Sequence, residues 1–228
     1  MPGYGDHYCQ EIARLFKLWA IYEPGRNVSC GDVLTYKDPD SSSHKSNPIG
    51  RFTKTAPIKK LNIKIPPQTE DIVAPMHYCS PGATFRFKEG PKLLEVTFAN
   101  GQDFFLTAIN CSQKRFDPSE LDQPTLKRLY EEYDWDTHFM VLGVLHAGRA
   151  LVLQASGAGA FFHIEGPEAH LLDPGINGSP SADHIMTINN KKLDHLYRIW
   201  REDHPLFLTL GQIRKTDEGH QMGIIIPT

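Results

Sequence analysis

The run FMVLGVLHAGRALVLQASGAGAFF, residues 139–162, decides which fold the rest of the chain must accommodate. A membrane-spanning helix needs about 20 mainly apolar residues, whereas His146, Arg149, Gln154 and four glycines fall within this run. The β-branched residues and glycines favour strands instead. We therefore expect strand, turn and strand, with the turn around residues 146–149.

The length of this hairpin leaves two uses open. Each arm has about eight to ten residues, close to the roughly 9–11 that a membrane-crossing strand needs. Strands of soluble proteins reach the same length. The periodicity by itself favours a hairpin buried inside a soluble protein.

Alternating apolar residues predict further strands on both sides of the run. They are expected at residues 32–37, 61–65, 84–88, 92–99, 102–109, 206–213 and 222–226. The Asn100-Gly101 pair predicts that residues 92–99 and 102–109 form a hairpin, because Asn-Gly between two strands is a strong turn signal.

Helical periodicity predicts helices at residues 6–21, 122–134 and 190–202. Residues 37–57, rich in Ser, Pro and Lys, show no apolar period and are expected to form a long loop. There is no regular β-α-β alternation, so the pattern predicts an α+β fold with a twisted, mostly antiparallel sheet, long hairpins and a few flanking helices.

The charge is distributed unevenly. The chain has 228 residues, 40% hydrophobic and 22% charged, and a formal net charge of −3, which is too small to indicate nucleic acid or a membrane. Residues 1–66, however, hold ten Lys and Arg against six Asp and Glu, so this third carries +4 and the remainder −7. The basic third is either an ordinary solvated surface or a site for an acidic partner.

Motifs for catalysis and metal binding are scarce. The chain has no G-x-S-x-G, H-E-x-x-H or P-loop motif, and Cys9, Cys30, Cys79 and Cys111 form no C-x-x-C pair. The N-terminal residues do not read as a signal peptide, so reduced thiols in the cytoplasm are expected. We expect no catalytic residues, no metal and no cofactor, although an enzyme whose site is dispersed along the chain stays open.

Several stretches follow one another in a recognisable order: the first helix, the strand GDVL, the basic loop, SELDQPTLKRLYEEYDW, the run 138–162 and HPLFLTLGQIRKTDEGHQM. This order resembles the pore-forming N-terminal domain of gasdermins. Residues 141–147 and 205–219 correspond to the family's degenerate strand motifs. Since the chain stops after the closing strands, it is most similar to fungal gasdermins of the regulator-of-cell-death type, and residues 1–228 are expected to form one such domain.

The resemblance implies a pore-forming cell-death effector that binds acidic phospholipids, oligomerises and inserts β-hairpins. It implies three partners: cardiolipin, phosphatidylserine or phosphoinositides; further copies of the chain; and an incompatible allelic variant, as in fungal allorecognition. No nucleic acid is expected. The chain would be cytoplasmic when soluble and would act at the plasma membrane or another acidic membrane.

The resemblance also implies where lipid would bind. The candidates are basic residues of the first helix and the following loop, with one aromatic residue as an apolar wedge: Arg14, Lys17, Lys45, Arg51, Phe52, Lys54, Lys59, Lys60 and Lys64. The inserting hairpins are expected within residues 58–109 and 138–188. A backbone in lipid must satisfy its hydrogen bonds between strands, so many copies would have to join edge to edge.

Two other functions stay open at this point. A soluble, non-enzymatic binding module could use the same basic loop to recognise a protein or a phosphorylated ligand. A small hydrolase or transferase could carry a dispersed site. Salt-sensitive binding to acidic vesicles would separate the pore former from the enzyme, and ring-shaped oligomers on membranes would separate it from the binding module.

Overall fold

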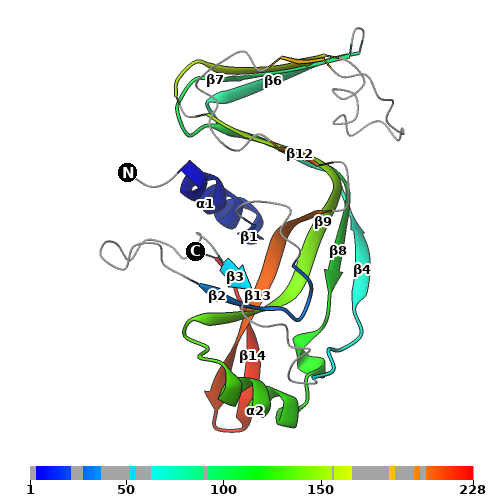
Figure 1. Ribbon diagram of the computed structural model, residues 1–228, viewed down its shortest axis with the longest axis vertical. Helices are drawn as coiled ribbons and strands as arrows, with labels where there is room; N and C mark the ends of the chain where they lie inside the picture. Colours follow the sequence, from blue (N-terminus) through cyan, green and yellow to red (C-terminus); the bar gives the residue numbers. More distant parts are fainter. Residues whose placement is uncertain are drawn as a thin grey trace. The chain divides into compact units, whose positions relative to one another are not determined.

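A computed structural model describes residues 4–21, 28–36, 52–54, 63–89, 92–155, 157–165, 185–187, 198–200 and 204–227 (Figure 1). The chain divides into two compact units. The first comprises Met1–Tyr8, Val73–Cys111 and Ala147–Asp203, and the second comprises Cys9–Ile72, Ser112–His146 and His204–Thr228. The predicted fold class is confirmed: the strands that have an assigned register pair antiparallel, and two α-helices accompany them.

A four-stranded sheet lies in the first unit, in the order β11-β10-β7-β6. Its strands are β6 (Ala83–Glu89), β7 (Lys92–Phe98), β10 (Ala160–Glu165) and β11 (Ile185–Thr187). One face is apolar and joins a buried cluster with side chains of two neighbouring strands; the cluster consists of Ala83, Leu94, Val96, Phe98, Phe105, Leu151, Leu153, Ala155, Ala160 and Phe162. Strand alternation therefore gives this sheet one buried and one polar face.

The other sheet has ten strands, and β9 (His138–Gln154) is its best-connected member. Strands β1 (Trp19–Ala20), β13 (His204–Thr216), β9, β2 (Val33–Tyr36) and β3 (Phe52–Lys54) follow one another across it. β14 (Gly219–Ile225) pairs with β13, and β12 (Arg198–Trp200) pairs with β9. β8 (Phe104–Arg115) pairs with β9, β4 (Thr69–Val73) and β5 (Met76–Cys79).

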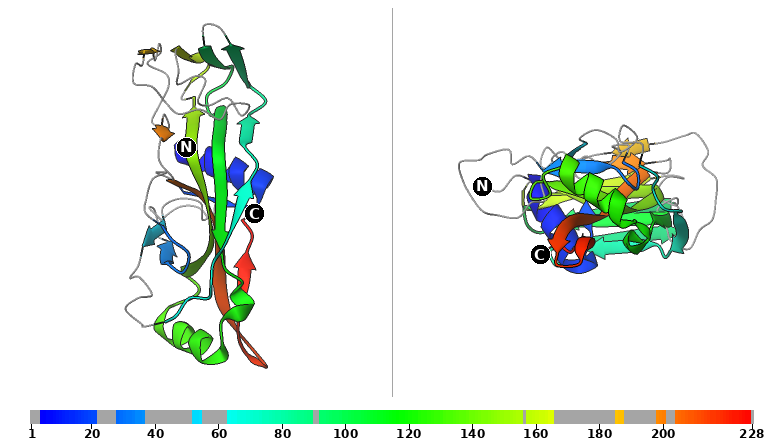
Figure 2. Two further views of the ribbon diagram at one scale, coloured as in Figure 1. Left: turned by 90° about the vertical axis from the view of Figure 1, so that its right-hand side faces the viewer. Right: turned by 90° about the horizontal axis from the view of Figure 1, so that it is seen from below.

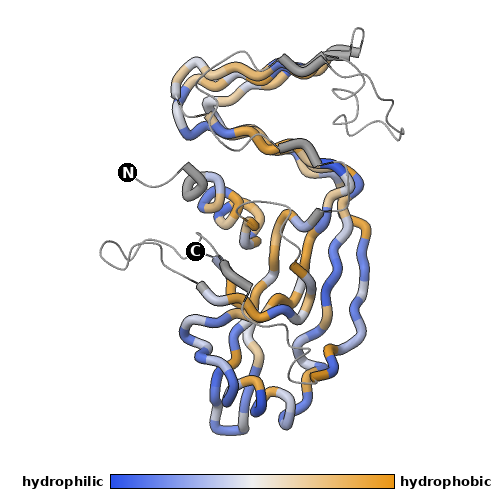
Figure 3. The backbone as a smooth tube through the Cα atoms, viewed as in Figure 1, coloured by the Kyte–Doolittle hydropathy of each residue, from blue (hydrophilic) through white to orange (hydrophobic). Residues whose placement is uncertain are grey.

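The predicted turn at residues 146–149 is wrong. β9 runs through it as one strand of 17 residues, and the next turn of the described chain lies at residues 157–159. The glycines allow close approach to β8 rather than a turn: a Cβ on Gly148 would lie 3.1 Å from Asn110 Cβ, and one on Gly143 would lie 3.3 Å from Arg115 Cβ. β9 is buried on both faces over most of its length, which explains why its sequence is almost continuously apolar. Figure 3 shows orange, hydrophobic stretches along the strands, interrupted by blue where polar residues occur.

The predicted hairpin through Asn100-Gly101 is also wrong. β7 pairs with β6 and β10, whereas β8 pairs with β4, β5 and β9. The residues between them form a corner: Asn100 N–H donates to Asp103 Oδ2 at 2.8 Å, and Gln102, in the left-handed region at φ 84°, donates to the Ala155 carbonyl at 2.8 Å. The chain thus leaves one sheet and enters the other at a signal that usually joins partners of one sheet.

The first helix is shorter than predicted. α1 comprises Tyr4–Phe16, because Lys17 takes a left-handed conformation at φ 55° and ends it. Trp19 and Ala20, expected in the helix, form β1 instead, with Trp19 opposite Leu208 of β13.

The second predicted helix is confirmed as α2, Gln123–Glu132. The Asp122 side chain caps it by accepting a hydrogen bond from Thr125 N–H, and a short 3-10 helix, Pro118–Glu120, precedes it. Gln123 exchanges two hydrogen bonds with the main chain of His220, so α2 lies beside the β13–β14 hairpin within the second unit (Figure 2).

The third predicted helix is wrong where it can be compared. Residues 198–200 form strand β12, with Ile199 opposite Leu151. Pairing with β9 therefore overrides the helical spacing of the sequence. Residues 188–197 lie outside the described part. Residues 63–65, expected in a strand, have no regular structure, and β3 lies inside the expected loop. The expected strands 32–37, 84–88, 206–213 and 222–226 are confirmed as β2, β6, β13 and β14.

Candidate membrane-interaction site

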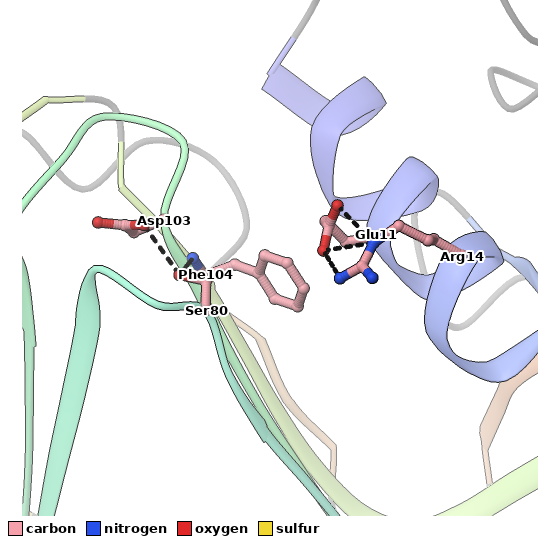
Figure 4. A network of polar contacts seen from close by, with 5 residues as sticks. All are labelled: Glu11, Arg14, Ser80, Asp103 and Phe104. Carbon is pink, nitrogen blue, oxygen red and sulfur yellow. Dashed lines mark hydrogen bonds and ion pairs between the residues drawn. The ribbon is translucent and has the colours of Figure 1, made fainter.

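Two of the predicted lipid-binding residues lie at the C-terminal end of α1. Arg14 is 62% exposed, and its guanidinium forms an ion pair with Glu11 at 2.8 Å (Figure 4). This pairing offsets part of the positive charge that the sequence assigns to the helix. Lys17 is exposed at the end of the helix, where the helix dipole favours a cation.

Aromatic side chains on either side of Lys17 hold the chain at this position. Phe16 stacks on Phe207 with ring centroids 6.3 Å apart and planes 19° apart. Trp19 Nε1–H donates to the Ile225 carbonyl at 2.9 Å. The main chain of Lys17 is therefore fixed by neighbours that contact β13 and β14, while its own side chain lies at the surface of the second unit.

Lys64 is a third exposed candidate, on the irregular segment 63–68. The next residue, Ile65, lies so close to Gly31 that a Cβ there would overlap it, and Gly31 itself is left-handed at φ +85°. The N–H of Gly31 donates to the Val141 carbonyl at 2.7 Å, and this hydrogen bond connects the turn at Gly31 to β9. The close contact between Ile65 and Gly31 thus holds the exposed ammonium group of Lys64 beside an ordered part of the second unit.

The remaining candidates are only partly covered by the structure. Phe52 and Lys54 lie on β3, which pairs with β2 so that Lys54 is opposite Leu34. Lys45, Arg51, Lys59 and Lys60 lie outside the described residues. The structure therefore places Arg14, Lys17 and Lys64, together with strand β3, in the second unit.

The sequence did not single out a second pair of basic residues, at the end of β8. Arg115 Nη2 lies 3.0 Å from Asp71 Oδ2, and Lys114 Nζ lies 3.8 Å from Glu70 Oε1. Because both acids belong to β4, these ion pairs hold an exposed edge strand and are already engaged. They are weaker candidates for lipid contact than Lys17 and Lys64.

The four-stranded sheet provides the second part of the candidate site. On its polar face Glu95 of β7 lies opposite Arg86 of β6 and opposite His163 of β10, and His163 Nδ1 is 3.4 Å from Glu95 Oε1. On the same face the hydroxyl groups of Thr84 and Thr97 are 2.7 Å apart. Charged and hydroxyl groups thus line one face of a sheet whose other face is apolar.

Three cysteines of the described chain, Cys30, Cys79 and Cys111, are weak nucleophiles. Burial raises the pKa of Cys30 and of Cys111 to about 11, and burial also raises the pKa of Cys79. The Cys79 thiol donates to the Ala83 carbonyl at 2.8 Å. Since the thiolate is the nucleophile, these thiols are inert near neutral pH.

Two further observations concern only the described residues. They include no group of three His, Cys, Asp or Glu side chains arranged to hold a metal ion. No helix among them is long and apolar enough to cross a bilayer.

Comparison with known proteins gives similarity among solved structures. No family model matches the chain. No curated protein matches its sequence. Among solved structures it is similar to a bacterial gasdermin from Bradyrhizobium tropiciagri at 13% identity, over 98% of this chain and 92% of that one, with a TM-score of 0.37.

Proposed function

We propose that this chain is a pore-forming cell-death effector that binds acidic phospholipids, oligomerises and inserts β-hairpins into the membrane. The observation that carries the proposal is the amphipathic sheet β6-β7-β10. A strand that separates lipid from a water-filled lumen needs alternating apolar and polar residues. β7 has this pattern: Val96 is fully buried in the apolar cluster, whereas its neighbour Thr97 is exposed.

Recruitment to the membrane would rest on the exposed cations of the second unit. A Lys or Arg near an anionic bilayer contributes about 1 kcal/mol, and this attraction falls with salt. Lys17 and Lys64 are exposed on ordered backbone, whereas Arg14 shares its charge with Glu11. We therefore assign the first contact with cardiolipin, phosphatidylserine or phosphoinositides to Lys17 and Lys64, and we propose that the basic residues of the loop contribute as well.

The biological setting that we propose follows the order of the sequence elements. A gasdermin-like chain of this kind would be cytoplasmic at rest and would move to the plasma membrane or another acidic membrane when active. Its partners would be further copies of itself and an incompatible allelic variant, as in fungal allorecognition. In this setting the trigger would be the encounter of two variants.

Dye release from vesicles tests the membrane part of the proposal. Phosphatidylcholine vesicles with and without cardiolipin or phosphatidylserine are compared at low and high salt, with the chain alone and with an allelic variant added. We expect release only from the acidic vesicles, more of it with the variant present, and less at high salt. Lys17→Glu with Lys64→Glu should reduce release, whereas Lys127→Glu, an exposed lysine of α2, should not.

Labels on the two faces of β6 test whether the sheet inserts. Thr84 is exposed on the polar face, and Phe85 is 46% exposed on the apolar face. A polarity-sensitive dye at position 85 should report an apolar environment when acidic vesicles are added, whereas a dye at position 84 should stay in water. Vesicle binding without release and without a dye response would favour the lipid- or phosphate-binding module, and absence of binding would remove the membrane proposal.

A further inference from the structure

Three strand connections meet in the first unit, and each joins a strand of the ten-stranded sheet to a strand of the four-stranded sheet. They join β5 to β6 at residues 80–82 and β7 to β8 at residues 99–103; of the connection from β9 to β10 the structure describes residue 155 and residues 157–159. Main-chain hydrogen bonds connect them: Ala99 N–H to Gly82 O at 2.7 Å, Gln102 N–H to Ala155 O at 2.8 Å, and Gly159 N–H to Phe98 O at 2.9 Å. The three bends therefore form one structure, which we call the corner.

The Asp103 carboxylate lies at the centre of the corner and is only 9% exposed. Oδ1 accepts a hydrogen bond from Ser80 Oγ at 2.9 Å (Figure 4). Oδ2 accepts one from Asn100 N–H at 2.8 Å. The Ser80 hydroxyl in turn accepts from Phe104 N–H at 3.0 Å. Through its main chain Asp103 also accepts from Ala155 N–H at 2.8 Å. One residue thus contacts all three bends.

Space around this carboxylate is limited. A Cβ on Gly82 would overlap Asp103 Oδ2, so the glycine lets the first bend approach the carboxylate closely. The conformation of the third bend also depends on a glycine, since Gly159 has φ +74°. Glycine is therefore required at the first bend by close approach and at the third bend by its backbone conformation.

Gln102 acts against the stability of the corner. It is left-handed at φ 84°, a conformation that a side chain with a Cβ adopts only at a cost in free energy. Its hydrogen bond to Ala155 and the contacts of the next residue, Asp103, hold it there. The corner therefore combines backbone strain with a buried carboxylate that opposes the release of that strain.

The lengths of the strands show why the corner matters for insertion. β6 and β7 have seven residues each and β10 has six, whereas a membrane-crossing strand needs about 9–11. None of the three is long enough without residues beyond its bend. If the corner straightened, β5 would continue into β6, β7 into β8 and β9 into β10, and each continuous strand would exceed that length.

We propose that Asp103 is the lock that keeps these three strands bent, and that opening of the corner is the step that extends the hairpins. The inference rests on the proposed pore-forming function. Asp103 acts through the main chain of the bends and contacts no lipid. Its removal should therefore accelerate opening without changing the affinity for acidic vesicles.

Asp103→Asn and Gln102→Gly test the lock with effects of opposite sign. Losing a hydrogen bond to a buried charge should accelerate corner opening by roughly tenfold to a hundredfold in Asp103→Asn. Relief of the left-handed strain should slow it by roughly fivefold in Gln102→Gly. Asp122→Asn is the matched control, because its carboxylate also accepts a backbone N–H but caps α2 in the second unit.

Two measurements separate the lock from the pore. Hydrogen exchange without vesicles follows the N–H groups of Asn100, Gln102, Phe104 and Ala155, and dye release from cardiolipin vesicles follows insertion. The expected result is that exchange and release both rise in Asp103→Asn, both fall in Gln102→Gly and stay unchanged in Asp122→Asn, at equal vesicle binding.

Other outcomes overturn one proposal or the other. The lock is rejected if these N–H groups exchange only with global unfolding in Asp103→Asn, or if they exchange faster while release stays at the wild-type rate. It is also rejected if Asp122→Asn changes release as much as Asp103→Asn. If the wild-type chain releases no dye at all, the pore-forming function fails, and local exchange of the corner in Asp103→Asn still decides whether Asp103 holds the bends.

Discussion

Adjacent phenylalanines of β10 allow a sharp test of the two faces of the sheet. Phe162 is 0% exposed, lies opposite Val96 and belongs to the buried cluster. Phe161 points to the polar face and is half-buried, with its ring centroid 6.1 Å from that of His163. Phe162→Ala removes a whole buried ring and leaves a cavity, so we expect a loss of about 3–5 kcal/mol in the free energy of unfolding. For Phe161→Ala, which loses one exposed ring contact, we expect a loss of about 1 kcal/mol.

Denaturant unfolding of the chain without vesicles measures both losses. The shift of the midpoint at an unchanged slope gives the difference in stability, and near-UV circular dichroism checks that each variant is folded in buffer. Equal losses for the two variants would refute the assignment of faces, because a strand slipped by one residue exchanges all its buried and exposed side chains. A larger loss for Phe161→Ala would place the other face of β10 in the core.

Three further predictions concern other parts of the described chain. Gly148→Ala should destabilise the fold by about 1–3 kcal/mol because its Cβ would crowd Asn110, whereas Gly223→Ala, with its nearest contact at 3.9 Å, should change unfolding little. Burial raises the pKa of Cys30 from 9.0 to about 11, so the folded state holds this proton more tightly than the unfolded state. The free energy of unfolding should therefore fall as the pH rises from 9 to 11, and in Cys30→Ala, measured by urea unfolding, it should depend less on pH in this range. The hydroxyl and N–H of Thr125 lower the pKa of Asp122 below its ordinary 3.8, so this carboxylate stabilises the fold above that pH and the contribution is lost as the pH falls; Asp122→Asn should flatten the acid limb of the unfolding profile.

The sequence predicts those strands well in which one face is buried. β6 and β7 are expected from their alternation, and the structure has them within one or two residues. β9 has no alternation to read because neighbours cover both of its faces. Its glycines suggested a turn, although at positions 143 and 148 they serve close approach to β8. Periodicity cannot distinguish glycines at a turn from glycines at a close approach between strands, because both place small residues in an apolar run.

The corner shows a second limit of sequence reasoning. Asn100-Gly101 was recognised as a turn, yet the partner of each flanking strand depends on hydrogen bonds to Ser80 and Ala155, which are distant in sequence. A local signal was available: Asp103 follows Asn100 by three residues, the spacing at which a carboxylate can accept the earlier N–H. That signal predicts a capped turn, but it does not predict which strands the turn connects.

For the lipid-binding candidates, the sequence gives the charge of each side chain. It does not show which charges form ion pairs, nor which side chains lie on backbone that neighbouring residues hold in place. Arg14 is offset by Glu11 one helical turn away, a pairing that the i, i+3 spacing already allows. Lys17 is expected inside a helix, but it adopts a left-handed conformation that ends α1 and leaves its side chain exposed. Helix propensity does not predict this conformation. The close approach of Ile65 to Gly31, which holds the segment of Lys64, joins residues too far apart in sequence to be predicted from it.

The apolar face of the sheet meets similar surroundings in both states that the proposed function requires. In the folded chain it contacts Phe105, Leu151 and Leu153, and in a bilayer it would contact acyl chains, which are about as apolar as leucine side chains. The transfer of this face alone therefore supplies little free energy for insertion. What changes is the backbone, since strands in lipid must be long enough to cross and must have every hydrogen bond satisfied by another strand. Substitutions on the apolar face, such as Phe162→Ala, should then lower the stability of both states, whereas a change at Asp103 acts on the bent state alone. This difference is why the rate of insertion should respond more to the corner than to the core.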